Sequence, residues 1–220
     1  MKKKSLMKRI RSGNTIYPDD SLVTRFYRQE NCEMKLKKIN AALGLLSILF
    51  ILIHMGYNVF AYLTFYYNPV LSKMTAVPFM ILVCLHAVCG MLVVFLQKDG
   101  SRMDLYPKQN LQTILQRASA ALIFPLLILH INTFAMMREA SEKGNVWFIV
   151  LLLMGELLFF AVVITHVAVS FTKGFITLGL LSSDRLRRKL DGVIYVVGAV
   201  CFLVASFVIM KGQIGMFLMG

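Results

Sequence analysis

Four histidines are the residues of this sequence whose type and spacing could do chemistry: His54, His86, His130 and His166. Neutral imidazole is the commonest metal ligand in proteins, and it also titrates near neutral pH. Each histidine lies inside a different long apolar stretch of the chain. Because an imidazole is costly to bury in hydrocarbon without a partner, each needs a metal ion, a proton relay or a hydrogen bond between helices.

The apolar stretches indicate an integral membrane protein. Of the 220 residues, 58% are hydrophobic and 16% charged, whereas roughly a quarter of the residues in soluble domains are charged. About 20 apolar residues span the hydrocarbon as a helix, and five stretches qualify: 41–63, 77–96, 112–137, 146–171 and 192–210. The sequence therefore predicts an all-α bundle of five transmembrane helices over 41–213. A basic segment, 1–40, precedes it and a short tail, 214–220, follows it.

Lysine and arginine predict how this bundle is oriented. If the first stretch runs outward, 20 of these residues lie on one side of the membrane and four on the other. Because basic residues accumulate on the cytoplasmic side, we expect a cytoplasmic N-terminus and an external C-terminus. The expected location is the cytoplasmic membrane of a bacterium or an archaeon. The net charge of +13 suits anionic lipid, and no nucleic-acid partner is expected.

Two local features modify the simple pattern of spans. Pro125 lies inside the stretch 112–137 and should kink that helix or free a carbonyl near Ala121. The segment "SSDRLRRKLDG", 182–192, is typical of a capped, basic, short helix at the cytoplasmic surface. No internal repeat is evident in the sequence.

Depth along the helices sorts the histidines into two pairs. With a rise of about 1.5 Å per residue, His54 and His130 lie roughly 20 Å from the cytoplasmic ends of their helices. His86 lies roughly 18 Å from that side, and His166 roughly 10 Å, or more if its helix continues past Lys173. The depths therefore suggest an outer pair, His54 with His130, and an inner pair, His86 with His166.

Two imidazoles from facing helices suit the six-coordinate iron of a haem, and bundle cores hold such cofactors. A zinc site would need three or four ligands at one level. A proton relay would need acids beside the histidines, and the five stretches contain a single acid, Glu156. The sequence also lacks the CxxCH motif of covalent haem attachment. Two haems b, each held by one histidine pair, are therefore predicted.

This pattern resembles the dihaem cytochrome b membrane anchor of succinate:quinone oxidoreductases, the family of succinate dehydrogenases and quinol:fumarate reductases. In the five-helix anchors of that family, each of the first four helices supplies one axial histidine. Helices one and three there share the haem farther from the soluble subunits. The stretch "LQRASAALIFPLLILH", 115–130, is similar to the family's third-helix pattern, with Ala120 where glycine is common. The resemblance covers about 41–210.

The resemblance implies the membrane subunit of an enzyme complex. It would pass electrons between a cytoplasmic iron–sulfur subunit and a membrane quinone, with menaquinone expected. The dicarboxylate chemistry would belong to a flavoprotein subunit, because this sequence has no GxGxxG motif and no cysteine cluster. A dihaem anchor for another donor, such as a hydrogenase or a disulfide reductase, would look alike. The alternative from another class is a transporter or structural membrane protein whose histidines carry protons or join helices.

Four further polar residues are candidates for the same site. Lys173 could pair with a propionate of the inner haem or be an ordinary interfacial lysine. Arg117 and Ser119 could bind a propionate or orient a polar headgroup; otherwise they are a positive anchor and a helix-packing serine. Glu156 could have a quinone or proton role, or accept a hydrogen bond from a neighbouring helix. The family's proton-transfer glutamate falls at Ile164 here, so that role is not transferred to Glu156.

Overall fold

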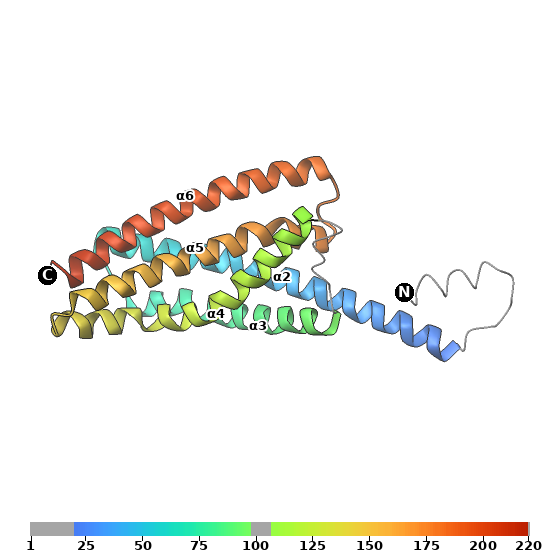
Figure 1. Cartoon of the computed structure of the whole chain (residues 1–220), viewed down its shortest axis with the longest axis horizontal. Coiled ribbons are helices and arrows are strands. Elements are labelled where there is room, and N and C mark those ends of the chain that lie inside the picture. The colour runs from blue at the N-terminus through green and yellow to red at the C-terminus, as the bar shows by residue number, and fades with distance from the viewer. Residues whose placement is uncertain (1–19, 98–106, 220) are drawn as a thin grey trace.

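The computed structural model describes residues 20–97 and 107–219, and this part of the chain is entirely helical apart from its turns. Five helices follow one another: α2 (Asp20–Thr64), α3 (Pro69–Gln97), α4 (Pro107–Glu142), α5 (Val146–Thr177) and α6 (Asp184–Phe217). They lie alongside one another in one elongated bundle (Figure 1). Each is long and apolar enough to cross a membrane. The predicted all-helical class with five spanning-length helices is therefore confirmed.

The helices continue beyond the apolar stretches into polar sequence. α2 begins at Asp20, inside the basic segment expected over 1–40. The rest of that segment and the loop 98–106, with its predicted cytoplasmic lysines and arginines, lie outside the described residues. α5 continues past Lys173 to Thr177, which places His166 eleven residues before its end. His166 thus lies farther from the end of its helix than the apolar stretch 146–171 suggested.

The basic segment 182–192 is the first part of α6. Ser183 caps the helix, and its side chain accepts a hydrogen bond from the backbone N–H of Leu186 at 3.4 Å. The helix then runs without a break to Phe217. The predicted cap is confirmed, whereas the predicted separate short helix is wrong. Gly192 follows Asp191 but stays helical, and no proline follows it, so the basic turns continue directly into the apolar ones.

Tight turns join the helices into two hairpins, α2–α3 and α4–α5. At the first turn, Asn68 caps α3 with its side-chain oxygen, and its backbone carbonyl accepts from the Tyr57 hydroxyl at 2.8 Å. At the second turn, Gly144 adopts a left-handed φ of 66°, which glycine does without steric cost. Asn145 then caps α5 by accepting from the Phe148 N–H. Short turns of this kind force each pair of helices to run antiparallel.

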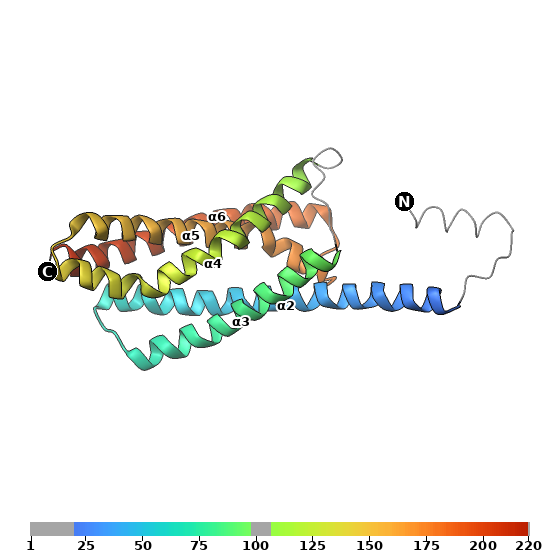
Figure 2. The ribbon, with the colours of Figure 1, turned by 60° about the horizontal axis from the view of Figure 1, so that its bottom comes forward.

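Packing is uneven across the bundle. α2 packs on α3, α4 packs on α5, and α6 covers α5 and α2, whereas α3 packs extensively only on α2. Figure 2 shows α3 crossing α2 obliquely, with α4, α5 and α6 gathered on the other side. The best-buried apolar cluster lies between α4, α5 and their neighbour α6: Met137, Ala140, Ile149, Leu152 and Leu153. No described side chain of α3 is fully buried.

α4 is bent near its middle. α4 changes direction about halfway along, in the region of Pro125 (Figures 1 and 2). Proline lacks an amide proton and its ring crowds the carbonyl four residues earlier, which explains the predicted kink.

We call the end of the bundle where α4 and α6 begin the basic end. Its described basic residues include Lys35, Lys37, Lys38, Arg117, Lys173, Arg185, Arg187, Arg188 and Lys189.

A close contact between α6 and α2 gives a test of this arrangement. A Cβ on Gly212 would overlap the ring of Tyr62, whereas a Cβ on Gly215 would meet nothing within 4 Å. Overpacking costs about 1–3 kcal/mol, while replacing a helical glycine by alanine otherwise gains about 0.5–1 kcal/mol. In thermal unfolding of the detergent-purified protein, we expect Gly212→Ala to unfold several degrees below wild type. Gly215→Ala should match or exceed wild type, and equal values for the two variants would contradict the packing of α6 on α2.

Candidate cofactor site

The inner pair of histidines meets across the bundle. His86 on α3 and His166 on α5 have ring centres 6.3 Å apart, with their planes at 66°. Metal–imidazole bonds are about 2 Å long and each nitrogen lies roughly 1.2 Å from its ring centre, so two imidazoles in line on one metal ion have centres about 6.4 Å apart. The observed separation therefore fits a shared metal ion.

His86 is held by a backbone carbonyl of the neighbouring helix. Its Nδ1–H donates to the carbonyl oxygen of Asn40 on α2 at 3.0 Å. Gly44, one turn further along α2, allows this approach, because a Cβ there would lie 2.9 Å from Cε1 of His86. The carbonyl places the proton on Nδ1 and leaves the lone pair on Nε2, which is the nitrogen left for a metal.

His166 is held in the same way by α4. Its Nδ1–H donates to the carbonyl oxygen of Gln116 at 3.1 Å, and the Ser119 hydroxyl oxygen lies 3.0 Å from the same nitrogen. The Ser119 hydroxyl donates its own proton to the Leu115 carbonyl at 2.7 Å, so its oxygen is an acceptor toward His166. Ser119 is buried. The structure thus places this serine against an imidazole, where the sequence suggested a propionate, a headgroup or simple helix packing.

The two hairpins repeat one arrangement. The spacing from Asn40 to His54 on α2 and from Gln116 to His130 on α4 is the same, 14 residues. On each helix the carbonyl accepts from the inner histidine of its own hairpin. A small residue, glycine or alanine, stands four positions after each carbonyl. This repeat was not evident in the sequence, because the spacing has meaning only once the carbonyls are known to be the partners.

In the outer pair, His54 is surrounded by neutral groups. Its Nδ1 lies 3.4 Å from the hydroxyl oxygen of Thr75 on α3. Thr75 donates its own proton to the Ser72 carbonyl, so it accepts from His54. The Asn58 amide donates to Nε2 at 3.2 Å, and the ring stacks on Phe79 with centres 6.0 Å apart. His54 therefore has the same tautomer as the inner pair, but its Nε2 already has a partner.

His130, the other outer histidine, has an acidic partner. Its Nδ1–H donates to Oε2 of Glu156 on α5 at 2.8 Å. Glu156 is 2% exposed, and no described residue hydrogen-bonds its Oε1. The His130 ring stacks on Phe159 with centres 4.7 Å apart. The hydrogen bond from a neighbouring helix, one of the roles expected for Glu156, is present; its quinone or proton role stays a prediction.

The two pairs fit a shared metal ion to different degrees. His54 lies within electrostatic range of His130, but no ring contact joins them among the described residues. In all four histidines the partner atoms place the proton on Nδ1. The inner pair fits two-point ligation as it stands, whereas Asn58 would have to release Nε2 of His54 first. No group of three or more histidine, cysteine or acidic side chains that could hold an ion occurs in the described ranges.

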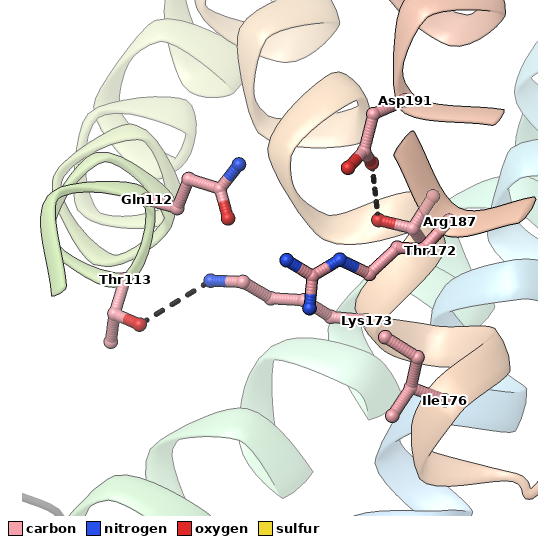
Figure 3. A pocket seen from close by; sticks show the side chains of 7 residues that line it. All are labelled: Gln112, Thr113, Thr172, Lys173, Ile176, Arg187 and Asp191. Atoms are coloured by element: carbon pink, nitrogen blue, oxygen red, sulfur yellow. Dashed lines mark hydrogen bonds between the residues drawn. The ribbon is translucent and has the colours of Figure 1, made fainter. Parts of the chain in front are cut away.

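Lys173 lies in a pocket of about 260 Å³ at the basic end. The pocket is lined by Gln112, Thr113, Thr172, Lys173, Ile176, Arg187 and Asp191 (Figure 3). The Lys173 ammonium donates to the Thr113 hydroxyl at 3.3 Å and to the Gln116 side-chain oxygen at 3.1 Å, and Arg187 lines the same pocket (Figure 3). No carboxylate in the described chain pairs with Lys173 at salt-bridge distance. Gln116 links this pocket to the inner pair, because its backbone accepts from His166.

Ser119 and Glu156, which contact His166 and His130, were candidates from the sequence, whereas four other residues around the histidines were not revealed by it. Asn40 and Gln116 act through backbone carbonyls, which every residue type carries. Gly44 and Thr75 had no pattern to distinguish them from packing residues. Arg117, expected to bind a propionate, is half-buried and lies within electrostatic range of Lys173, though it does not line the pocket.

No protein-family model, no curated protein and no solved structure matches this chain. The interpretation of the site therefore depends on the four histidines, their partners and the resemblance carried by their spacing.

Proposed function

We propose that this chain is a dihaem cytochrome b membrane subunit that carries electrons between an iron–sulfur partner and a membrane quinone. The observation that carries the proposal is the inner pair. The ring centres of His86 and His166 are 6.3 Å apart, and both Nδ1 atoms donate to helix carbonyls. Two lone pairs are thereby left for one iron. The five helices of spanning length support a multi-pass membrane protein.

The histidines would hold the two haems in the predicted pairs. His86 and His166 would ligate the inner iron, and His54 and His130 the outer iron, once the Asn58 amide has turned from Nε2 of His54. Each bound iron supplies reversible one-electron chemistry that the side chains themselves lack. With two histidines on each iron, no position would be left open for another ligand, so the arrangement would suit electron transfer. The carbonyls of α2 and α4 fix the ring orientations.

The basic end is proposed to lie on the cytoplasmic side and to contact the partner subunit and anionic lipid. Lys173 lies seven residues after His166, on nearly the same face of α5, and its ammonium lacks an acidic partner within the described ranges. We therefore assign it to a propionate of the inner haem, with Arg187 in the same pocket. Arg117 and Ser119 also lie at this end, where Ser119 acts on His166 directly.

The outer half is proposed to face the quinone. Glu156 has one oxygen without a partner in the described chain, so a quinol hydroxyl could donate to it. In the resulting complex, a succinate dehydrogenase or fumarate reductase of a bacterial or archaeal cytoplasmic membrane, the dicarboxylate chemistry belongs to a flavoprotein subunit. Menaquinone is the expected quinone. An anchor for another electron donor would use the same histidines and differ in the co-purifying chains.

A reduced-minus-oxidised optical spectrum tests the haem assignment. We expect the detergent-purified protein to show a low-spin b-type spectrum with close to two haems per polypeptide. Single variants should then separate the sites: His86→Ala or His166→Ala should lose the inner haem, and His54→Ala or His130→Ala the outer one. A colourless, folded protein from haem-replete cells would overturn the proposal and leave the histidines as hydrogen-bonding or proton-carrying groups.

The glycine beside His86 gives a subtler test with a matched control. Gly44→Ala would bring a Cβ within 2.9 Å of the His86 ring, so the ring must move off the Asn40 carbonyl. Gly56→Ala, on the same helix, meets nothing within 4 Å. We expect Gly44→Ala to lower the content of the inner haem while the outer haem is retained, and Gly56→Ala to keep both. Full haem content in Gly44→Ala would show that the close approach of α3 to α2 is not needed.

A further inference from the structure

The four histidines differ in the charge of their Nδ1 partners. His86 and His166 donate to backbone carbonyls, and His54 faces the hydroxyl of Thr75. His130 donates to the carboxylate of Glu156 at 2.8 Å, the shortest of the four contacts. Three partners are neutral groups and one is an acid.

Thr75 and Glu156, the Nδ1 partners of the two outer histidines, occupy corresponding places in the two hairpins. Thr75 lies eleven residues before His86 on α3, and Glu156 lies ten residues before His166 on α5. Each stands on the second helix of its hairpin and contacts the outer histidine on the first helix. The repeated arrangement thus continues into the outer half, but a carboxylate replaces the hydroxyl. Either group can hold the ring through Nδ1, so the two outer contacts differ in the acidity of the partner.

Glu156 lies where a negative charge would interact strongly with its neighbours. The side chain is 2% exposed, so solvent screens it weakly. One oxygen is committed to His130, and the other has no partner among the described residues. A histidine that donates its second nitrogen to a carboxylate becomes a more basic ligand. A more basic ligand, with negative charge behind it, stabilises the more positively charged, oxidised state of a metal.

We propose that Glu156 is a positioning residue that lowers the reduction potential of the outer haem through its hydrogen bond to His130. The proposal rests on the proposed function, because it needs an iron bound to His130. The step concerned is the uptake of one electron, which converts ferric iron to ferrous iron. Glu156 makes this uptake less favourable, and Thr75, acting on the other axial histidine, leaves it nearly unaffected.

Optical redox titration tests this on the intact protein. Wild type, Glu156→Gln and Thr75→Val are reduced stepwise with dithionite, and His130→Ala identifies the outer transition by its loss. Glutamine keeps an acceptor oxygen but removes the charge. We expect Glu156→Gln to raise the equilibrium constant for reduction of the outer haem at least tenfold, which for one electron is about 59 mV. The inner transition should not move, and Thr75→Val should shift the outer one far less.

The other possible results of the titration also test the proposed role of Glu156. An unchanged outer potential in a Glu156→Gln protein with two haems would overturn the proposal, as would equal shifts of both haems or an equal shift in Thr75→Val. If Glu156→Gln loses the outer haem, the near-infrared charge-transfer bands of the oxidised wild type test whether His130 is the stronger donor. One band displaced to shorter wavelength supports stronger donation from His130, and coincident bands contradict it. A wild-type protein without haem would instead refute the proposed function, so the two failures are distinguishable.

Discussion

The bundle depends on the need of each half-buried imidazole for a partner at Nδ1. In an apolar span no water supplies that partner, so a neighbouring helix must come close enough to do so. For the inner pair, α2 and α4 offer carbonyls that are already part of their helices. A carbonyl oxygen has two lone pairs and can accept a second hydrogen bond without breaking the helix. On α2 the approach needs a residue without a Cβ one turn later, which Gly44 provides.

Once the Nδ1 atoms are bound, the chemistry of the site follows. Nε2 keeps the lone pair and points away from the helix that holds the ring, because the two nitrogens lie on opposite sides of the imidazole. Histidine in this state has one nitrogen that can ligate a metal, accept a hydrogen bond or take up a proton. The single tautomer of all four rings therefore suits ligation, and the contact of His130 with Glu156 also supplies the acid that a proton relay would use.

The sequence was sufficient for the features that depend on long apolar runs. Helices of spanning length need about 20 apolar residues, so the five helices and the placing of one histidine in each of four could be predicted. Features that depend on backbone contacts could not. Nothing marks the carbonyl of Asn40, which lay in the segment assigned to the basic N-terminus. The start of α2 at Asp20 and the continuous α6 were also missed, because polar residues alone do not end a helix and Gly192 stays helical.

The uneven packing suggests what a cofactor would add to stability. α3 has no fully buried described side chain and packs extensively only on α2, yet His86 reaches the ring of His166 on the other hairpin. Iron shared by these two histidines would join the hairpins covalently at a point where apolar packing does not. Because a preformed site is absent from the unfolded chain, the binding free energy of such a group adds to the folding free energy. In that case the haems are structural elements of the bundle as well as electron carriers, and α3 is the helix whose position depends on them most.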